Sequence, residues 1–313
     1  MVALTSQVDY HMDDERTAQK KCNSPDMVFI VASPRSGTNA LAWALAQHPM
    51  IWTSGESNFL LYLFGKGHLQ GAYKKACMSS ETGWLKANQV SFEEFAAHLG
   101  AGVDSLYRSR CQGKVWIEHT PMYSEFAADT LTVMFPHARF LHLVRDGRSV
   151  VCSMLNSGFR SWRARSFFVA CFTWVISIRR GLALERACPG RTLRVRQEDM
   201  VDDPQRVIAE VLEFVGLRND EHPVQFLKAN RINSSFDNDD GKTIHDVKDT
   251  QALKVRRWST WSYLRLLMFR CVAGGTMRAL GYSDTKQQAR VTGRLAASAP
   301  ERDVPAWHRI QGL

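Results

Sequence analysis

The sequence predicts an α/β protein built on a doubly wound parallel sheet with helices on both faces. Short apolar runs rich in β-branched residues alternate with longer segments whose apolar residues recur at helical spacing. Parallel strands connected by helices are buried on both faces, so they appear in a sequence as continuous apolar runs. The 313 residues, 45% hydrophobic and 23% charged, fit a globular chain with one core.

The expected strands lie at residues 27–31, 50–53, 114–118, 139–144 and 192–196. Helices are expected at residues 41–48, 91–110, 121–134, 160–187, 203–216 and 252–280. Two more are expected, one that ends at about Phe64 and one that begins at about Ser149. Local signals support several starts: Ser91-Phe92-Glu93-Glu94 is a capping box, and Asp203-Pro204 and Pro121 are typical of first helical turns. Segments 65–90 and 231–250 show no clear period and are expected to be irregular.

Residues 25–283 are expected to form one domain, between a polar tail at 1–24 and a loose tail at 284–313. The first 24 residues lack the apolar stretch of a signal peptide, and the apolar run Ser166–Ile178 has only about half the length that a bilayer needs. Seven scattered cysteines suit a reducing compartment. These observations predict a cytoplasmic protein. The arginines that flank the apolar run leave peripheral membrane contact open, although a buried helix is favoured.

An anion site is expected where the first strand gives way to a helix, at Pro34-Arg35-Ser36-Gly37-Thr38-Asn39. The first N–H groups of a helix lack internal partners, and the helix dipole favours negative charge there. Arg35 adds a planar fork of donors, and the net charge of +9 suits an anionic ligand. A plain corner with an exposed arginine is the alternative. A nucleotide-triphosphate P-loop does not fit, because Arg35 precedes the single glycine and no lysine follows it.

This turn resembles the 5′-phosphosulfate loop of sulfotransferases that use 3′-phosphoadenosine-5′-phosphosulfate (PAPS), whose tyrosylprotein and bacterial branches carry P-R-S-G-T. Three further motifs follow in the order of that family. Arg145 and Ser153, in RDGRSVVCS, resemble its 3′-phosphate motif, although taken alone they suit an Arg145–Asp146 pair and a serine bonded to its own helix. The sequence EHTPMY resembles E-K-[ST]-P-x-Y, with His119 in place of lysine. The fourth motif resembles Y-E-D-[LM], with Gln197 in place of the tyrosine near adenine.

The resemblance covers roughly residues 27–283 and implies a P-loop-like phosphosulfate-binding turn. It implies transfer of a sulfuryl group from PAPS to a hydroxyl or amine acceptor, with release of adenosine 3′,5′-bisphosphate. A glycan or other metabolite is the expected acceptor, and neither a metal nor a nucleic acid is implied. The residues expected to hold the donor are Arg35, Ser36, Gly37, Thr38 and Asn39 at the phosphosulfate and Arg145 and Ser153 at the 3′-phosphate.

The expected catalytic residues are Arg35, Glu56 and His119. Glu56 is the first choice for the base, because Glu56-Ser57-Asn58-Phe59 resembles the E-x-H-F stretch of heparan-type relatives. His119 is the second choice. It could take the proton as neutral imidazole, or replace the family lysine as a cation. Its alternative role is that of a strand-end histidine bonded to a backbone carbonyl.

Several alternatives stay open. The acceptor could be a glycan, a lipid, a peptide tyrosine or a small phenol, because acceptor pockets are built from irregular segments. A non-catalytic anion- or glycan-binding protein on the same fold and a nucleotide kinase or NTPase are the other two functions. The basic-aromatic run Lys254-Val255-Arg256-Arg257-Trp258 could touch an anionic glycan or the donor, but a solvated helix face is favoured. The oligomeric state is left open.

Overall fold

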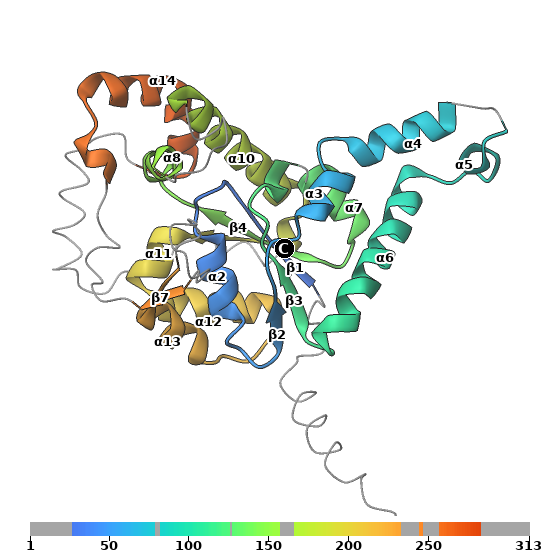
Figure 1. Ribbon diagram of the computed structural model, residues 1–313, viewed down its shortest axis with the longest axis horizontal. Coiled ribbons are helices and arrows are strands. Elements are labelled where there is room, and N and C mark those ends of the chain that lie inside the picture. Colours follow the sequence, from blue (N-terminus) through green and yellow to red (C-terminus); the bar gives the residue numbers. More distant parts are fainter. Residues whose placement is uncertain are drawn as a thin grey trace, which may run out of the picture.

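The centre of the protein is a five-stranded sheet in the order β2-β3-β1-β4-β5, with helices on both faces (Figure 1). The computed structural model describes residues 27–78, 82–125, 127–156, 166–232, 244–246 and 257–282. The strands are β1 Met27–Ala32, β2 Ile51–Thr53, β3 Val115–Glu118, β4 Arg139–Val144 and β5 Thr192–Arg196, and neighbouring strands are parallel. The predicted doubly wound α/β fold is confirmed.

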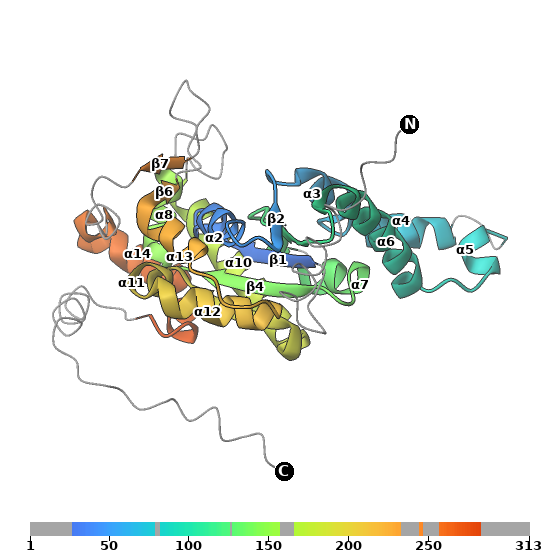
Figure 2. The same ribbon diagram turned by 90° about the horizontal axis from the view of Figure 1, so that it is seen from below.

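The described helices are α2 Thr38–Leu45, α3 Asn58–Phe64, α4 His68–Met78, α5 Trp84–Ala87, α6 Phe92–Cys111, α7 Thr132–Met134, α8 Gly147–Leu155, α10 Phe167–Ala187, α11 Gln197–Asp202, α12 Pro204–Val215, α13 His222–Ala229 and α14 Tyr263–Ala279. Shorter turns are η1 Tyr123–Glu125, η2 Ala127–Leu131, η3 Pro189–Arg191 and η5 Arg257–Thr260. A small antiparallel pair, β6 Asn230–Ile232 and β7 Ile244–Asp246, lies beside α13. Helices α4 and α5 extend away from the sheet, and α6 runs back from them to pack on β3 (Figures 1 and 2).

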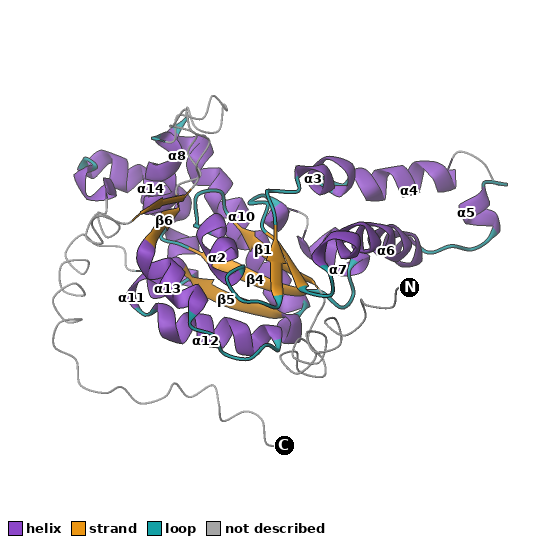
Figure 3. Ribbon diagram, turned by 60° about the horizontal axis from the view of Figure 1, so that its bottom comes forward, coloured by secondary structure: helices purple, strands orange, loops and turns teal. Residues whose placement is uncertain are grey.

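The central strand β1 divides the core in two, because its side chains alternate between the faces of the sheet. Val28 and Ile30 pack in one cluster with α2 and α12, and Phe29 and Val31 pack in another with α6, η2 and α7. A third cluster joins α8, α10 and α14 and includes the buried ring of Trp174. Helices therefore cover both faces and leave the strand ends for loops (Figure 3).

Three helix predictions differ from the structure. Segment 65–90 is not irregular: it forms α4 and α5, which are fixed by tertiary packing such as the Tyr73 ring against Phe92. The single helix expected at 121–134 is broken into η1, η2 and α7. Helix α2 ends before His48, whose ring is buried and accepts a hydrogen bond from the Met50 N–H.

Other predictions are met in part. The helix expected at 160–187 begins at Phe167 as α10, and the run expected at 252–280 contains η5 and α14. The 231–250 segment contains β6 and β7 rather than only loop. The tails at 1–24 and 284–313 and the residues Lys254 to Arg256 lie outside the described residues.

Helix α10 has two different sides. Gly181 packs so closely on the ring of His142 that a Cβ atom would overlap it, whereas Phe168, Phe172 and Ile176 are exposed on a stripe of the opposite side. By length and composition α10 could cross a membrane, but 44% of its most apolar window is buried inside the protein. The expectation of a buried helix therefore holds for one side of α10 only.

Candidate active site

The predicted site residues gather at the carboxyl ends of the strands. In open α/β sheets this edge is where ligands bind. The turn after β1 carries Arg35, the turn after β2 carries Glu56, β3 is followed directly by His119, and β4 by Arg145. Segments far apart in the chain are thus brought to one edge of the sheet by parallel pairing.

The turn after β1 has the backbone of an anion-binding loop. Arg35 has a φ of 70° and Gly37 a φ of 101°, both in the left-handed region, which is costly for a side chain such as that of arginine. Helix α2 starts at Thr38, directly after this turn. Its first N–H groups, which lack partners within the helix, therefore lie beside this turn. Backbone strain held at this point indicates a constraint other than packing.

The structure brings the two predicted phosphate motifs into contact. The Arg35 Nε donates to the Ser153 Oγ at 3.1 Å, and Arg145 Nη1 donates to the Arg35 carbonyl at 2.9 Å. The alternative pairing of Arg145 with Asp146 is wrong. Asp146 instead forms an ion pair with Arg148, with 2.7 Å between Oδ2 and Nη2. The Arg148 guanidinium also lies 3.9 Å from the centre of the buried Trp258 ring. The solvated-face interpretation is therefore wrong for Trp258.

Two buried polar atoms of this site lack a partner among the described residues: Ser36 Oγ and Arg145 Nε. Burial lowers the pKa of both Arg35 and Arg145, and the charge of Arg145 lowers that of Arg35 further. Buried donors are normally satisfied, and two cations held together repel each other. An anion bound here would satisfy the free donors and relieve the repulsion, so the residues present fit a phosphate- or sulfate-bearing ligand.

Residues that the sequence analysis did not single out support this junction. The Glu198 side chain accepts the Asp146 N–H at 2.9 Å and the Tyr282 hydroxyl at 2.8 Å. Trp174 Nε1 donates to the Arg145 carbonyl at 3.2 Å. Gln197, which the fourth motif had already identified, lies beside the anion loop, since a Cβ atom at Gly37 would be 3.4 Å from its Cγ. In the sequence, the only sign of a role for Glu198 is its position directly after Gln197 in the fourth motif.

His119 is buried, and the contacts of its ring favour one tautomer. The Thr53 hydroxyl donates to the Ile117 carbonyl at 2.8 Å, so only its lone pair remains for the His119 Nδ1 at 3.4 Å. These contacts favour a proton on Nδ1 and a lone pair on Nε2. Burial lowers the pKa of His119, against the opposing charge of Glu118. These contacts favour the neutral-base role over the cationic one, and the ring's described partner is a hydroxyl rather than a backbone carbonyl.

Glu56 lies in the turn between β2 and α3 and is exposed. Desolvation by its surroundings and the charge of Glu118 both raise the pKa of Glu56. A raised pKa makes a carboxylate a stronger base, and it brings the group closer to neutral pH, where proton transfer is most effective. Both predicted base candidates therefore have shifted pKa values, and Glu118 acts on both.

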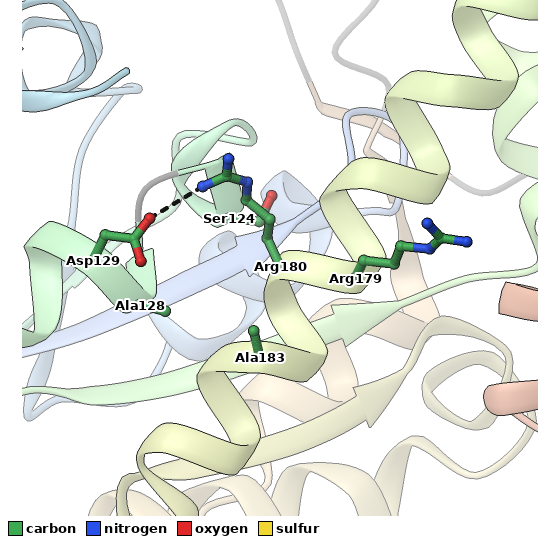
Figure 4. Close-up of a pocket in the computed structure, with 6 residues that line it drawn as sticks. All are labelled: Ser124, Ala128, Asp129, Arg179, Arg180 and Ala183. Atoms are coloured by element: carbon green, nitrogen blue, oxygen red, sulfur yellow. Dashed lines mark hydrogen bonds and ion pairs between the residues drawn. The ribbon is translucent and has the colours of Figure 1, made fainter. Parts of the chain in front are cut away.

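A shallow pocket of about 220 Å³ lies beside the strand ends, between α10 and the η1–η2 segment (Figure 4). Ser124 lines it and donates to the carbonyl of Ala32, the last residue of β1, at 3.3 Å. Arg180 on its rim pairs with Asp129 at 3.1 Å, and both side chains are about half exposed. In the described part of the chain, no group of three His, Cys, Asp or Glu side chains could hold a metal ion.

Comparisons with known proteins give a family match and a related sequence. The model of a family described as "Sulfotransferase family" matches residues 25–221. A putative protein-tyrosine sulfotransferase from Caenorhabditis briggsae is 22% identical over 268 residues, which cover 82% of this chain and 86% of that protein.

Two solved structures resemble the protein at low identity. One is the sulfotransferase domain of the Synechococcus PCC 7002 olefin synthase, with a TM-score of 0.47, 20% identity and coverage of 92% of this chain and 98% of that one. The other is the mouse sulfotransferase SULT7A1 complexed with PAP, with a TM-score of 0.46, 14% identity and coverage of 90% and 91%.

Proposed function

This chain belongs to the sulfotransferase family, and from that premise we propose that it transfers the sulfuryl group of PAPS to a hydroxyl or amine acceptor. The observation that carries the proposal is the joint formed by Arg35, Ser153 and Arg145. Two motifs that would hold opposite ends of one doubly phosphorylated nucleotide lie in contact. Within the described residues, Ser36 Oγ and Arg145 Nε remain free to donate to it.

Each group in the joint has a proposed role. Arg35 and the N–H groups from Ser36 to Asn39 bind the 5′-phosphosulfate, and Arg145 and Ser153 bind the 3′-phosphate. An in-line displacement at sulfur, like phosphoryl transfer, depends mainly on positioning and on stabilising charge at the leaving oxygen. Arg35 supplies that charge, since it lies in the turn that would cradle the bridging oxygen.

The acceptor hydroxyl must lose its proton as the new S–O bond forms, and Glu56 and His119 are the proposed bases. Glu56 is reachable from solvent, which suits a group that meets an incoming acceptor. His119 is buried, which lowers its pKa and favours the neutral ring. The acceptor is proposed to be a glycan or another metabolite, and lipids, peptide tyrosines and small phenols are its competitors in an acceptor screen.

The test is thermal unfolding with adenosine 3′,5′-bisphosphate, compared with AMP and with Mg·ATP. At about 100 times its dissociation constant, the bisphosphate should stabilise the folded protein by about 2.7 kcal/mol without any metal. AMP should stabilise it less, because AMP lacks the 3′-phosphate. A shift with Mg·ATP and none with the bisphosphate would contradict the donor assignment and favour a kinase.

Binding alone does not show transfer. The second step is incubation with ³⁵S-labelled PAPS and a panel of glycan, lipid, peptide and phenol acceptors. Label transferred to one class identifies the acceptor. Tight bisphosphate binding without transfer to any class would instead indicate a non-catalytic anion-binding protein on the same fold.

A further inference from the structure

Glu118, the last residue of β3, holds a buried carboxylate surrounded by donors. Its Oε1 accepts from the N–H groups of Ser57 at 3.3 Å, His119 at 2.9 Å and Thr120 at 3.1 Å, and from the Thr120 hydroxyl at 2.9 Å. Its Oε2 accepts from the Tyr107 hydroxyl at 3.0 Å. None of these described partners is a cation. An ionised carboxylate only accepts, so this set of donors fits the charged form.

Glu118 acts together with two tyrosines on Ser57, the residue after Glu56. The Tyr107 hydroxyl also contacts the Ser57 Oγ, and the Tyr123 hydroxyl donates to the Ser57 carbonyl at 2.9 Å. The N–H, carbonyl and hydroxyl of Ser57 are therefore all engaged. Both tyrosines are buried, and the Tyr107 ring stacks on Trp116 with 4.2 Å between ring centres. The turn that carries Glu56 is thereby tied to the rigid core.

We propose that Glu118 is a positioning residue for the acceptor side of the site, where it fixes the turn bearing Glu56 and the turn bearing His119 relative to each other and supplies the negative charge that both groups face. The inference rests on the proposed sulfotransfer. Its geometric basis is the carboxylate itself, which spans the ends of β2 and β3 through N–H groups of Ser57 and His119.

The negative charge of Glu118 is not needed to hold the two turns in place. A neutral amide could accept the same N–H groups, whereas a buried carboxylate without a cation carries a desolvation cost. The charge of Glu118 contributes to the raised pKa of Glu56 and opposes the fall in the pKa of His119 caused by burial. The other titratable groups at this cluster, Tyr107 and Tyr123, have pKa values raised by burial and stay neutral.

Glu118→Gln separates charge from geometry, because glutamine keeps an acceptor oxygen and nearly the same shape. The readout is the titration of His119 by NMR in protein labelled with ¹³C at the histidine ε1 carbons, with the resonance assigned by His119→Asn. We expect the His119 midpoint to move to lower pH in Glu118→Gln, because a negative charge that favours the protonated ring is lost. The exposed control Glu213→Gln, on α12, should leave the midpoint unchanged.

The same variant tests the consequence for catalysis. In Glu118→Gln we expect a lower kcat, an acid limb of the pH–rate profile that shifts to lower pH, and unchanged affinity for adenosine 3′,5′-bisphosphate. An unshifted His119 midpoint and an unshifted acid limb in a folded Glu118→Gln protein would overturn the positioning role. Failure of the wild-type protein to bind the bisphosphate is a different result, which overturns the proposed function.

Glu118→Asp covers the case in which the glutamine variant does not fold. Aspartate keeps the charge but draws the oxygens back from Ser57 by one methylene. We expect faster amide hydrogen exchange at Ser57, unchanged exchange at Val28 in the core, and a reduced kcat with unchanged bisphosphate affinity. Faster exchange at Ser57 with full turnover would show that Glu118 only stabilises the loop and would overturn the proposal.

Discussion

Replacing Arg145 with alanine gives the sharpest test of how the donor is held. Arg145 can make two kinds of contact. Its Nη1 supports the anion loop through the Arg35 carbonyl at 2.9 Å, and its buried Nε has no partner among the described residues. Only a ligand with a 3′-phosphate should accept a hydrogen bond from this Nε. The variant should therefore weaken adenosine 3′,5′-bisphosphate more than AMP.

The two losses differ in size. A charge-assisted contact to a phosphate is worth about 1.5–3 kcal/mol, which corresponds to a rise in the bisphosphate dissociation constant of about 10- to 150-fold. AMP should lose only the support that Arg145 gives to the loop. That support is a hydrogen bond from the guanidinium to a carbonyl, and it reaches AMP only indirectly through the loop, so AMP is expected to lose about 1 kcal/mol, or about fivefold. Arg145→Lys should fall between wild type and alanine for the bisphosphate, because lysine keeps the charge without the planar fork.

Isothermal titration calorimetry with both nucleotides measures these constants, and circular dichroism confirms that each variant is folded. Arg206→Ala is the matched control, because Arg206 is an exposed arginine on α12 whose ion pairs are with Asp199, Asp203 and Glu210. Its two dissociation constants should match wild type. Equal weakening of both nucleotides in Arg145→Ala would refute the reasoning, since it would mean that Arg145 acts only through the loop.

Four further predictions concern the base candidates, Ser36, Glu185 and the segment 286–313. Glu56→Gln should lower turnover by about 10²–10⁴-fold, while calorimetry shows unchanged bisphosphate affinity. His119→Lys should lose turnover, because the neutral imidazole is replaced by a buried cation. Full turnover in both variants would contradict both base assignments. Ser36→Ala should weaken the bisphosphate but leave the urea midpoint of the free protein unchanged or higher, since its buried hydroxyl lacks a partner in the described chain. Burial acts to raise the pKa of Glu185, but contacts from an arginine and a histidine outweigh it and lower that pKa to about 2 from 4.5. The free energy of unfolding should therefore fall as the pH drops from about 4.5 toward 2, and urea titrations of Glu185→Gln should lack that slope. Deleting residues 286–313 should leave the bisphosphate affinity within about twofold of wild type, whereas loss of soluble protein would show that this segment is packed.

Most of the sheet could be predicted because β1, β2, β3 and β4 are short, largely apolar runs that end at polar or glycine-bearing turns, whereas the edge strand β5 alternates apolar residues with arginines. Strands β4 and β5 match their predicted bounds, and β1, β2 and β3 lie within one residue of theirs. The edge of the sheet at which the site lies could also be predicted, because parallel strands place their carboxyl ends together. Local pattern was sufficient where burial on both faces leaves little choice of structure.

The parts that could not be predicted depend on contacts between distant segments. Helix α4 buries only Leu69 and therefore has almost no apolar stripe of its own to reveal it. The hydrogen bond from Arg35 to Ser153 joins residues 118 positions apart. Glu118 stood inside a recognised motif, yet its role depends on Ser57 and Tyr107, which reach it from other elements. Such contacts have no period in the sequence.

The strand order also separates the charges of the site in a way that suits the proposed reaction. The cations Arg35 and Arg145 follow β1 and β4, whereas Glu56, Glu118 and His119 follow or end β2 and β3, on the other side of β1 in the order β2-β3-β1-β4-β5. In sulfuryl transfer, negative charge grows on the leaving oxygen while the acceptor gives up a proton. Fixed positive groups near the first and fixed proton acceptors near the second lower the barrier without reorganisation during the reaction. Glu56 and Glu118 are thus attached to strands on the other side of β1 from Arg145. Burial lowers the pKa of Arg145, the carboxylates whose charges act to raise it are Glu198 and Asp146, and Asp146 pairs with Arg148. The Arg145 Nε therefore has no partner among the described residues and can donate to the nucleotide.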